Sequence, residues 1–279
     1  MIAASTTWTT VRSYMQRACG VVLAEEQSYL LEARLGPVAK QFQFGSIAEF
    51  VVVAARASAQ SPEAQALIEA MTTHETSFFR DAKFWQALEE GVLPPLIAAS
   101  RTGRSLRIWS AACSTGQEPY SLAMLLSEKW PDVFDRVEIL ATDVSELSVE
   151  RAKRGFFSTM EVNRGLGAAR LVRHFDTAPG GFQIKAKVAS RISWSSHNLL
   201  AAQASPSQCD IVLCRNVLIY FDDLDRAAVV KRLVRATVDG GFVAVGCTES
   251  LVGPSFAPGW YRNTVSGASE AISTLRKTG

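Results

Sequence analysis

The stretch LRIWSAACSTGQEPYSLA, residues 106–123, decides the fold. It begins as an apolar, strand-like run, continues through a loop of small residues that ends at Gly116, and then follows a helical pattern. A strand, a small-residue loop and a helix in this order are typical of open α/β sheets, which bind ligands outside the carboxyl ends of their strands. The small side chains also let the backbone approach a ligand closely. We therefore expect a ligand at this loop.

The loop lacks the features of a phosphate-binding turn. A dinucleotide site would show the G-x-G-x-x-G fingerprint and free helix N–H groups, but this loop has only Gly116. Glu118, at the start of the helix, would repel a phosphate and attract a cation such as the ammonium of a bound amino acid. This favours S-adenosylmethionine, which carries an ammonium and a sulfonium and no phosphate. The alternative is that Glu118 only complements the helix dipole.

An acid follows the next β-rich run. Asp143 comes just after the strand-like residues 137–141 and lies 27 residues beyond Gly116. A carboxylate at about this distance can accept hydrogen bonds from both ribose hydroxyls of a nucleoside. The alternative role is the N-cap of a helix over residues 144–154. Together, the loop, Glu118 and Asp143 predict a nucleoside-binding site that has no grip on a phosphate.

The rest of the chain predicts a parallel sheet preceded by helices. Apolar residues recur at helical spacing through the first 75 residues, where Ser61 and Pro62 predict a helix that runs to Met71. Beyond them, β-rich runs over residues 106–109, 137–141, 192–194, 211–214 and 242–245 largely alternate with helical patterns such as residues 120–130 and 222–238. The predicted fold class is α/β: an all-α domain over residues 1–75 and a Rossmann-like domain over residues 76–279.

One segment interrupts the alternation. Pro179, Gly180 and Gly181 form a turn signal, and residues 182–188 then alternate apolar and polar side chains strictly. The pattern predicts a strand over residues 182–188. It also predicts a β-hairpin subdomain, over about residues 172–190, inserted in the α/β domain.

The composition disfavours several classes of protein. A net charge of +2 is too small to indicate binding to nucleic acid or to a membrane surface. The five cysteines are scattered and the three histidines form no cluster, which disfavours disulfides and metal sites. No apolar run approaches the roughly 20 residues that cross a bilayer, and no export signal begins the sequence. We expect a reduced, cytoplasmic protein.

Two further polar stretches lie where ligands are expected. The apolar strand over residues 211–214 ends in Arg-Asn, so that Asn216 and the nearby Tyr220 fall on the ligand side of the sheet. Residues 72–80, TTHETSFFR, connect the two domains and crowd polar side chains around two aromatics. Taken alone, Tyr220 is more often a packing residue with a wet hydroxyl, and His74 a surface or hydrogen-bonded histidine.

Six motifs resemble the chemotaxis receptor methyltransferase (CheR) family in order and spacing: TTHETSFFR, WSAACSTGQEPYSLAM, ILATDVS, HNLL, CRNVLIYF and GCTES. The resemblance covers nearly the whole chain. It implies a class I methyltransferase domain with a helical N-terminal domain and an inserted β-subdomain. It also implies an enzyme that uses S-adenosylmethionine to form methyl esters on receptor glutamates. The alternatives are a Rossmann methyltransferase with another substrate and a non-catalytic module that senses S-adenosylmethionine or S-adenosylhomocysteine.

The resemblance also implies roles for individual residues. Near the transferred methyl it implies Arg80 and Tyr220. His74 stands where the family usually has Asn, and Gln117 where it often has Glu. The implied cofactor contacts are His74, Thr76, Arg80, Glu118, Asp143, Asn198, Leu199, Asn216 and Val217.

The implied reaction needs no general base, because a glutamate with a pKa of about 4.3 is already ionised at pH 7. We expect catalysis by in-line positioning, with Arg80 steering the carboxylate and Tyr220 donating a hydrogen bond beside the methyl. The resemblance implies that the substrate is a receptor whose helical bundle bears acidic surfaces. Arg34 and Lys40 are therefore candidate docking residues, although a solvated helix face is an equally good interpretation of them.

The inserted hairpin bears on how the receptor is recognised. Family members that grip a C-terminal pentapeptide tether add it as a strand to the β-subdomain. Members that do not need the tether have a shorter loop there. Only residues 176–181 separate Phe175 from the strand that begins at Phe182, which resembles the short form. We expect no pentapeptide tether.

Overall fold

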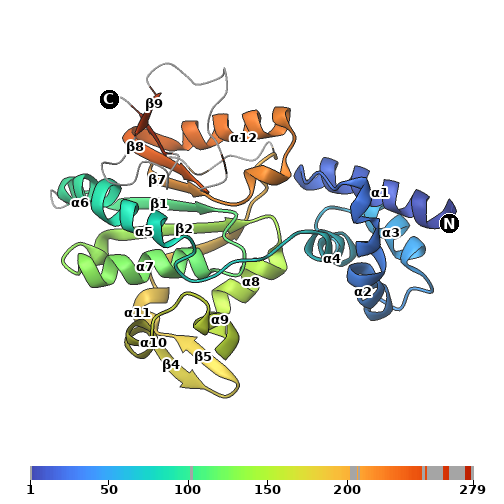
Figure 1. Cartoon of the computed structure of the whole chain (residues 1–279), viewed down its shortest axis with the longest axis horizontal. Helices are drawn as coiled ribbons and strands as arrows, with labels where there is room; N and C mark the ends of the chain where they lie inside the picture. The colour runs from blue at the N-terminus through green and yellow to red at the C-terminus, as the bar shows by residue number, and fades with distance from the viewer. Residues whose placement is uncertain are drawn as a thin grey trace.

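The computed structural model describes residues 2–100, 103–201, 206, 208–246, 249, 260–263 and 274–277. Figure 1 shows a group of N-terminal helices on one side and a larger α/β part on the other. An extended segment joins them between α4 (Pro62–Met71) and α5 (Ala82–Ala87). The expected boundary at residue 75 falls in this segment, and the division of the chain into two domains there stays a prediction.

The helical part is built around apolar residues that meet at its centre. Trp8, Met15 and Phe50 are fully buried there. The helix predicted from Ser61 to Met71 is confirmed as α4, and Ser61 Oγ accepts a hydrogen bond from the N–H of Ala64 (3.1 Å) as its N-cap. The remaining elements of this part are α1 (Ile2–Cys19), η1 (Glu25–Tyr29), η2 (Leu31–Leu35), α2 (Gly36–Gln41) and α3 (Ile47–Arg56).

In the described part of the chain, the α/β part contains a seven-stranded sheet in the order β6-β2-β1-β7-β8-β10-β9. Its first five strands pair in parallel, and β10 runs antiparallel to both neighbours. Each of the five predicted runs lies within one of the parallel strands, which confirms the Rossmann-like α/β fold. The strands are β1 (Leu106–Ala111), β2 (Val137–Asp143), β6 (Ile192–Ser196), β7 (Cys209–Cys214), β8 (Thr237–Val245), β9 (Trp260–Asn263) and β10 (Thr274–Lys277).

The strand order reverses at β1, which has β2 on one side and β7 on the other. Such a switch point opens a crevice at the carboxyl ends of the strands. Successive residues of β1 face different helices: Ile108 packs in the cluster that includes α6 and α7, and Trp109 in the cluster that includes α12. The helices around the sheet are η3 (Leu88–Val92), α6 (Leu93–Ser100), α7 (Gln117–Lys129), η4 (Phe134–Arg136), α8 (Glu146–Arg154), η5 (Leu218–Tyr220) and α12 (Asp223–Ala236).

A smaller antiparallel sheet, in the order β3-β5-β4, lies below the main sheet in Figure 1. The predicted hairpin is present as β4 (Phe175–Ala178) and β5 (Gly181–Ile184), which pair across a turn at residues 179 and 180. The sheet also takes in β3 (Phe156–Phe157), which lies outside the predicted insertion. Short helices accompany it: α9 (Thr159–Asn163), α10 (Ala168–His174) and α11 (Ala186–Ala189).

The predicted strand over residues 182–188 is wrong beyond Ile184. The chain turns there into α11, with Lys185 as its N-cap. Ile184 and Val188 are both buried, and they lie four residues apart, which is a helical spacing. A strictly alternating pattern of seven residues therefore concealed a change of period.

Neither a membrane span nor a metal cluster occurs in the described residues. No helix among them is long and apolar enough to cross a membrane. No group of three or more His, Cys, Asp or Glu side chains within these ranges is placed to hold a metal ion. The four cysteines in the described ranges, Cys19, Cys113, Cys209 and Cys214, are free and buried, and Cys247 lies outside the described residues.

Candidate functional site

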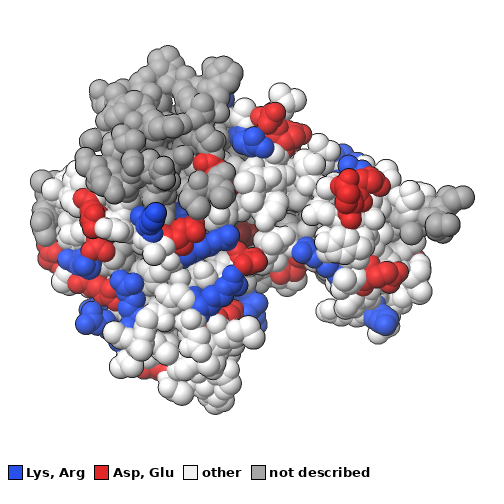
Figure 2. All heavy atoms as spheres, viewed as in Figure 1, with Lys and Arg blue, Asp and Glu red and all other residues white. Residues whose placement is uncertain are grey.

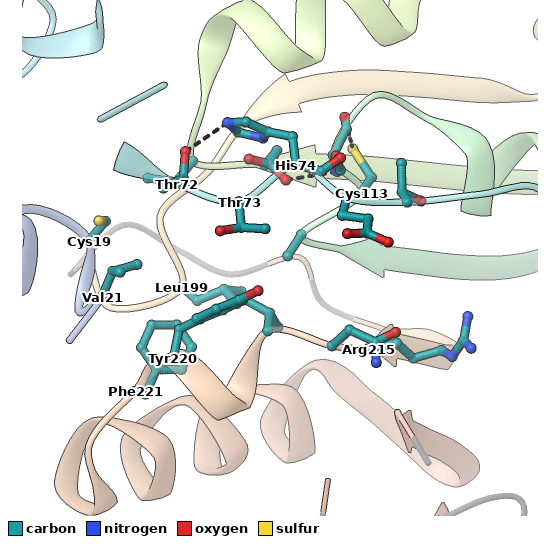
Figure 3. A pocket seen from close by; sticks show the side chains of 18 of the residues that line it. Cys19, Val21, Thr72, Thr73, His74, Cys113, Leu199, Arg215, Tyr220 and Phe221 are labelled. Atoms are coloured by element: carbon teal, nitrogen blue, oxygen red, sulfur yellow. Dashed lines mark hydrogen bonds between the residues drawn. The ribbon is translucent and has the colours of Figure 1, made fainter. Parts of the chain in front are cut away.

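A cavity opens where the helical part meets the carboxyl edge of the main sheet. About 1270 Å³ of space between the side chains lies within it, with the open solvent at its mouth included. In Figure 3, Thr72 and His74 lie on one side of it, and Leu199 and Tyr220 on the opposite side. The cavity brings together every site residue predicted from the sequence: His74, Thr76, Arg80, Glu118, Asp143, Asn198, Leu199, Asn216, Val217 and Tyr220.

The loop between β1 and α7 forms one wall of this cavity. Its backbone is tightly wound, with positive φ angles at Ala112 (63°), Ser114 (51°) and Gly116 (96°). A Cβ at Gly116 would lie 2.9 Å from the Cβ of Ala152 in α8, so both the φ angle and the contact require glycine. The sequence prediction of a small-residue ligand loop thus describes a turn that packs closely against the next helix.

Asp143 ends β2 and fastens this loop. Its Oδ2 accepts a hydrogen bond from the N–H of Ser114 (2.8 Å), and its Oδ1 accepts one from the N–H of Ser145 (3.0 Å). Burial raises the pKa of Asp143, although both N–H groups act to lower it. The alternative role for Asp143, as the N-cap of the next helix, is wrong, because Ser145 caps α8 through the N–H of Ser148. Asp143 is left to face the cavity.

Glu118 belongs to a charge cluster that the sequence interpretation missed. One oxygen accepts a hydrogen bond from the hydroxyl of Ser110 (2.7 Å), and the other pairs with Arg215 (3.0 Å). Arg215 also pairs with Asp81 (2.8 Å) and lies over the ring of Phe84, 3.8 Å from its centroid. The available signal was an Arg directly after an apolar strand, because such a residue reaches the same sheet edge as Glu118.

His74 lies in the cavity wall, but its imidazole is held by protein groups. Nε2 lies 2.7 Å from the hydroxyl of Thr72 and 3.2 Å from a carboxylate oxygen of Glu69, and Nδ1 lies 3.0 Å from the hydroxyl of Ser148. Figure 3 shows the ring turned toward Thr72, on the side of the cavity away from Tyr220. The backbone carbonyl of His74, by contrast, accepts a hydrogen bond from Ser114 Oγ (3.1 Å) in the ligand loop. The cofactor contact expected of the His74 side chain stays a prediction.

Arg80 stands in an unusual stretch of backbone. The residues on either side of it, Phe79 and Asp81, have positive φ angles of 50° and 63°. Non-glycine residues in this region cost of order 1–3 kcal/mol each and cluster at functional sites. The guanidinium of Arg80 donates a hydrogen bond to the carbonyl of Glu75 (2.9 Å), and the backbone carbonyl of Arg80 accepts one from Arg215 (2.9 Å). Arg80 is thus linked to the charge cluster around Glu118.

The helical part completes the wall that carries Tyr220. Asn198 donates a side-chain hydrogen bond to the carbonyl of Ala18 (2.6 Å), and the N–H of Val22 donates to the carbonyl of Tyr220 (2.8 Å). Gly20, with a φ angle of 76°, leaves no room for a Cβ, which would lie within 3 Å of the ring of Phe221. The end of α1 is therefore clamped onto the loops after β6 and β7.

Comparison with known proteins identifies the family. The sequence profile described as "CheR methyltransferase, SAM binding domain" matches residues 74–261, more than half of the chain. This chain belongs to the CheR methyltransferase family. Chemotaxis protein methyltransferase 1 of Pseudomonas aeruginosa is 37% identical to it over 258 residues, covering 90% of this chain and 92% of that protein. Chemotaxis protein methyltransferase Cher2 of Pseudomonas putida is 36% identical, covering 87% and 89%, and Chemotaxis protein methyltransferase 1 of Vibrio cholerae is 33% identical, covering 86% and 87%.

Membership of the CheR family decides between several of the sequence interpretations. It confirms S-adenosylmethionine as the cofactor and a methyltransferase as the class of enzyme. The non-catalytic sensing module gains no support from the similar proteins. The roles of individual residues in this CheR-family site rest on their chemistry and positions.

Proposed function

We propose that this enzyme transfers the methyl group of S-adenosylmethionine to glutamate side chains of chemotaxis receptors, forming methyl esters and S-adenosylhomocysteine. The observation that carries the proposal is the cavity itself. Asp143, a carboxylate suited to a ribose, and the charge cluster around Glu118 both border it. Arg80 and Tyr220 line the same cavity. Such a site suits a cationic nucleoside and an acidic side chain that reaches it.

The charge of the cluster supports S-adenosylmethionine over a phosphate-bearing cofactor. Glu118 and Asp81 share a single guanidinium, that of Arg215, so the group carries one negative charge in excess. S-Adenosylmethionine has an ammonium, a sulfonium and one carboxylate, which leaves it with a positive charge. A dinucleotide would bring two phosphates toward the carboxylates and would be repelled.

Asp143 is proposed to bind the ribose. Each of its oxygens accepts one backbone N–H, and each has a second lone-pair direction for a ribose hydroxyl. Leu199 and Val217 supply apolar surface, and the other proposed contacts add polar groups around the cofactor, namely His74, Thr76, Arg80, Glu118, Asn198 and Asn216.

The chemical step is a displacement at the sulfonium methyl. A carboxylate oxygen of the receptor glutamate attacks the methyl carbon, the carbon–sulfur bond breaks, and the electron pair stays on sulfur. The carboxylate is ionised at neutral pH, so no side chain has to remove a proton. The enzyme supplies in-line positioning, which can lower a barrier by about 7–11 kcal/mol. Arg80 is proposed to steer the carboxylate, and Tyr220 to place its hydroxyl beside the methyl.

Receptor docking is proposed to use the helical part and the mouth of the cavity. Of the two candidate docking residues, Arg34 donates to the carbonyls of Ala70 (3.3 Å) and Thr72 (3.0 Å), so it is engaged in holding the end of α4. Lys40 is exposed on α2 and stays a docking candidate. On the face seen in Figure 2, Lys and Arg are interspersed with Asp and Glu, which supports a protein partner over nucleic acid.

We also propose that the enzyme recognises its receptor without a pentapeptide tether and that it acts in the cytoplasm. The hairpin between β4 and β5 has a turn of two residues, and this short form supports recognition of the receptor without a pentapeptide tether. Receptor glutamates that accept methyl groups lie on the cytoplasmic helical bundle, so the enzyme is proposed to act in the cytoplasm.

Labelled methyl transfer tests the proposed function. The purified protein is incubated with S-adenosylmethionine labelled in its methyl group and with membranes that contain receptors. We expect label on the receptor band and its release as methanol by mild base, because esters are base-labile. A receptor with Gln at its acceptor positions is the control and should take no label. Label that resists mild base, or that appears on no receptor, would contradict the proposal, and binding of S-adenosylhomocysteine without any transfer would favour the sensing module.

A further inference from the structure

A buried carboxylate lies behind the loop that carries Asn216 and Tyr220. Glu249 follows β8 and is 5% exposed. One of its oxygens accepts hydrogen bonds from the N–H groups of Asn216 (2.6 Å) and Gly246 (2.7 Å). The other accepts from the N–H of Leu218 (2.7 Å) and, at a longer distance, from that of Ile219 (3.4 Å). A single carboxylate therefore gathers backbone donors from the ends of two neighbouring strands.

These donors need such a partner. The first N–H groups of a short helical turn have no acceptor within the turn, and Leu218 begins η5, whose last residue is Tyr220. Asn216 has a φ angle of 59°, so the chain bends sharply just before the turn. Hydrogen bonds to a carboxylate are shorter and stronger than those between neutral groups. Glu249 thus holds both the bend and the turn.

The opposite side of η5 is fixed by other contacts. The carbonyl of Leu218 accepts a hydrogen bond from Arg226 (3.2 Å), and the carbonyl of Tyr220 accepts one from the N–H of Val22 (2.8 Å). Because the carbonyl end of the turn is held separately, loss of Glu249 should release its N-terminal end and shift Tyr220 without freeing the whole loop.

The close packing at Gly246 supports the same assignment. A Cβ at this position would lie 2.8 Å from a carboxylate oxygen of Glu249 and 2.8 Å from the side-chain nitrogen of Asn216. Glycine therefore leaves the space into which the carboxylate fits. The methyl group of an alanine at this position would displace the carboxylate of Glu249 and the side chain of Asn216.

We propose that Glu249 is a positioning residue for methyl transfer, which holds Asn216 and Tyr220 in the wall of the cavity. Glu249 is not among the residues that line the cavity, so it acts through the backbone of the loop after β7. This inference rests on the proposed role of Tyr220 beside the transferred methyl.

A double-mutant cycle tests the inference. Glu249→Gln keeps the size of the side chain but turns an NH2 donor toward backbone N–H donors. We expect it to lower kcat at saturating S-adenosylmethionine by about 10- to 100-fold, because misplacement of a catalytic group by about 1 Å can cost a factor of this size. In the Tyr220→Phe background the same substitution should lower kcat by less than about threefold, because the hydroxyl that it positions is gone.

Two further variants complete the experiment. Glu161→Gln is the matched control: Glu161 accepts a hydrogen bond from the N–H of Ser158 (2.9 Å) in α9, away from this loop, and its substitution should leave kcat unchanged. If Glu249→Gln does not fold, as judged by thermal unfolding, Gly246→Ala takes its place in the cycle with the same expected coupling.

Each outcome has a defined meaning. A Glu249→Gln enzyme with the kcat of the wild type, or one that loses the same factor in both backgrounds, would overturn the positioning role while the assignment of Tyr220 stands. Full activity of Tyr220→Phe alone would remove the proposed role of Tyr220 and the inference about Glu249 together. A large loss in the wild-type background and a small loss in the Tyr220→Phe background would support both.

Discussion

Asp143 is a single carboxylate that both fastens the ligand loop and lines the cavity. Its two oxygens accept the N–H groups of Ser114 and Ser145, and we propose that their remaining lone pairs accept the ribose hydroxyls. We predict that Asp143→Ala weakens binding of S-adenosylhomocysteine by about 1.5–3 kcal/mol, the scale of hydrogen bonds to a charged group. This corresponds to a rise in Kd of roughly 10- to 150-fold, which calorimetric titration measures directly.

A matched substitution separates this effect from a general loss of charge. Asp176 is exposed on β4 in the small sheet, so Asp176→Ala removes the same group at a distance from the cavity. Its Kd should equal that of the wild type. Equal affinity of the Asp143→Ala and wild-type proteins would show that the carboxylate does not bind the cofactor.

Tyr220 should affect the chemical step and leave cofactor binding almost unchanged. Its ring packs against the helical part, and the Phe substitution preserves that packing while it removes the hydroxyl. We predict that Tyr220→Phe lowers kcat for receptor methylation with little change in the Kd of S-adenosylhomocysteine. Tyr29, which is 71% exposed, provides the control, and Tyr29→Phe should keep both values. A Tyr220→Phe enzyme that is fully active would rule out the role of the hydroxyl.

At the scale of elements, α10 is attached to α7 by a partly buried charged group. Glu128 in α7 accepts hydrogen bonds from His174 (2.8 Å) and Arg170 (3.0 Å) in α10. Arg170 also lies over the ring of Phe79, 3.8 Å from its centroid. Phe78, in the same segment as Arg80, also packs edge-on against Phe157 and Phe175 of the small sheet. These contacts join the small sheet to that segment.

The burial of His174 makes the stability of the fold depend on pH. Burial lowers the pKa of His174, and it outweighs the opposing effect of Glu128. Because the pKa of His174 is lower in the folded state, the unfolded chain binds the proton first as the pH falls. The stabilisation that neutral His174 gives the fold is therefore complete above pH 6.5 and is lost as the pH falls below that value. We predict that wild-type protein loses more unfolding free energy between pH 7.5 and 5.5 than His174→Gln protein does.

Denaturant unfolding at the two pH values measures the difference. His197 shows a shift in the same direction, but it is present in both proteins and cancels in the comparison. Between pH 8.5 and 7.5 the two proteins should change equally, because His174 is neutral throughout in either state. Identical losses between pH 7.5 and 5.5 would show that the environment of His174 does not favour its neutral form.

At the scale of the whole molecule, the small sheet bears on how a receptor is held. Its β4 is a four-residue strand at the edge of the sheet, and the hairpin turn beyond it is short. A peptide that adds to a sheet edge gains affinity from main-chain hydrogen bonds along that edge. A four-residue strand offers few such hydrogen bonds. We therefore predict that a receptor C-terminal pentapeptide shows no low-micromolar binding to the purified protein. Calorimetry tests this, with S-adenosylhomocysteine as the positive control, and low-micromolar binding would show that the tether is used.

The sequence by itself determined the fold class and predicted the edge of the sheet at which the candidate site residues meet. A strand, its loop and its helix are neighbours along the chain, and the carboxyl ends of parallel strands meet at one edge of the sheet. Gly116, Glu118, Asp143, Asn216 and Tyr220 therefore could be gathered into one site from their positions after apolar runs. The motifs added residues 72–80, which no periodicity would have brought to the cavity.

Only the tertiary structure decided the partners of these residues. Arg215 meets Asp81 from a position 134 residues away in the chain, and Glu249 reaches the N–H of Asn216 from beyond the end of β8. His74, whose side chain was expected to contact the cofactor, directs its ring at Thr72 and Ser148. Apolar periodicity records which side chains are buried, but it does not record which polar groups meet, because those contacts depend on how separate loops pack against one another. The residues that meet at the cavity could therefore be predicted from the sequence, whereas the hydrogen bonds and ion pairs that hold its walls depend on the tertiary structure.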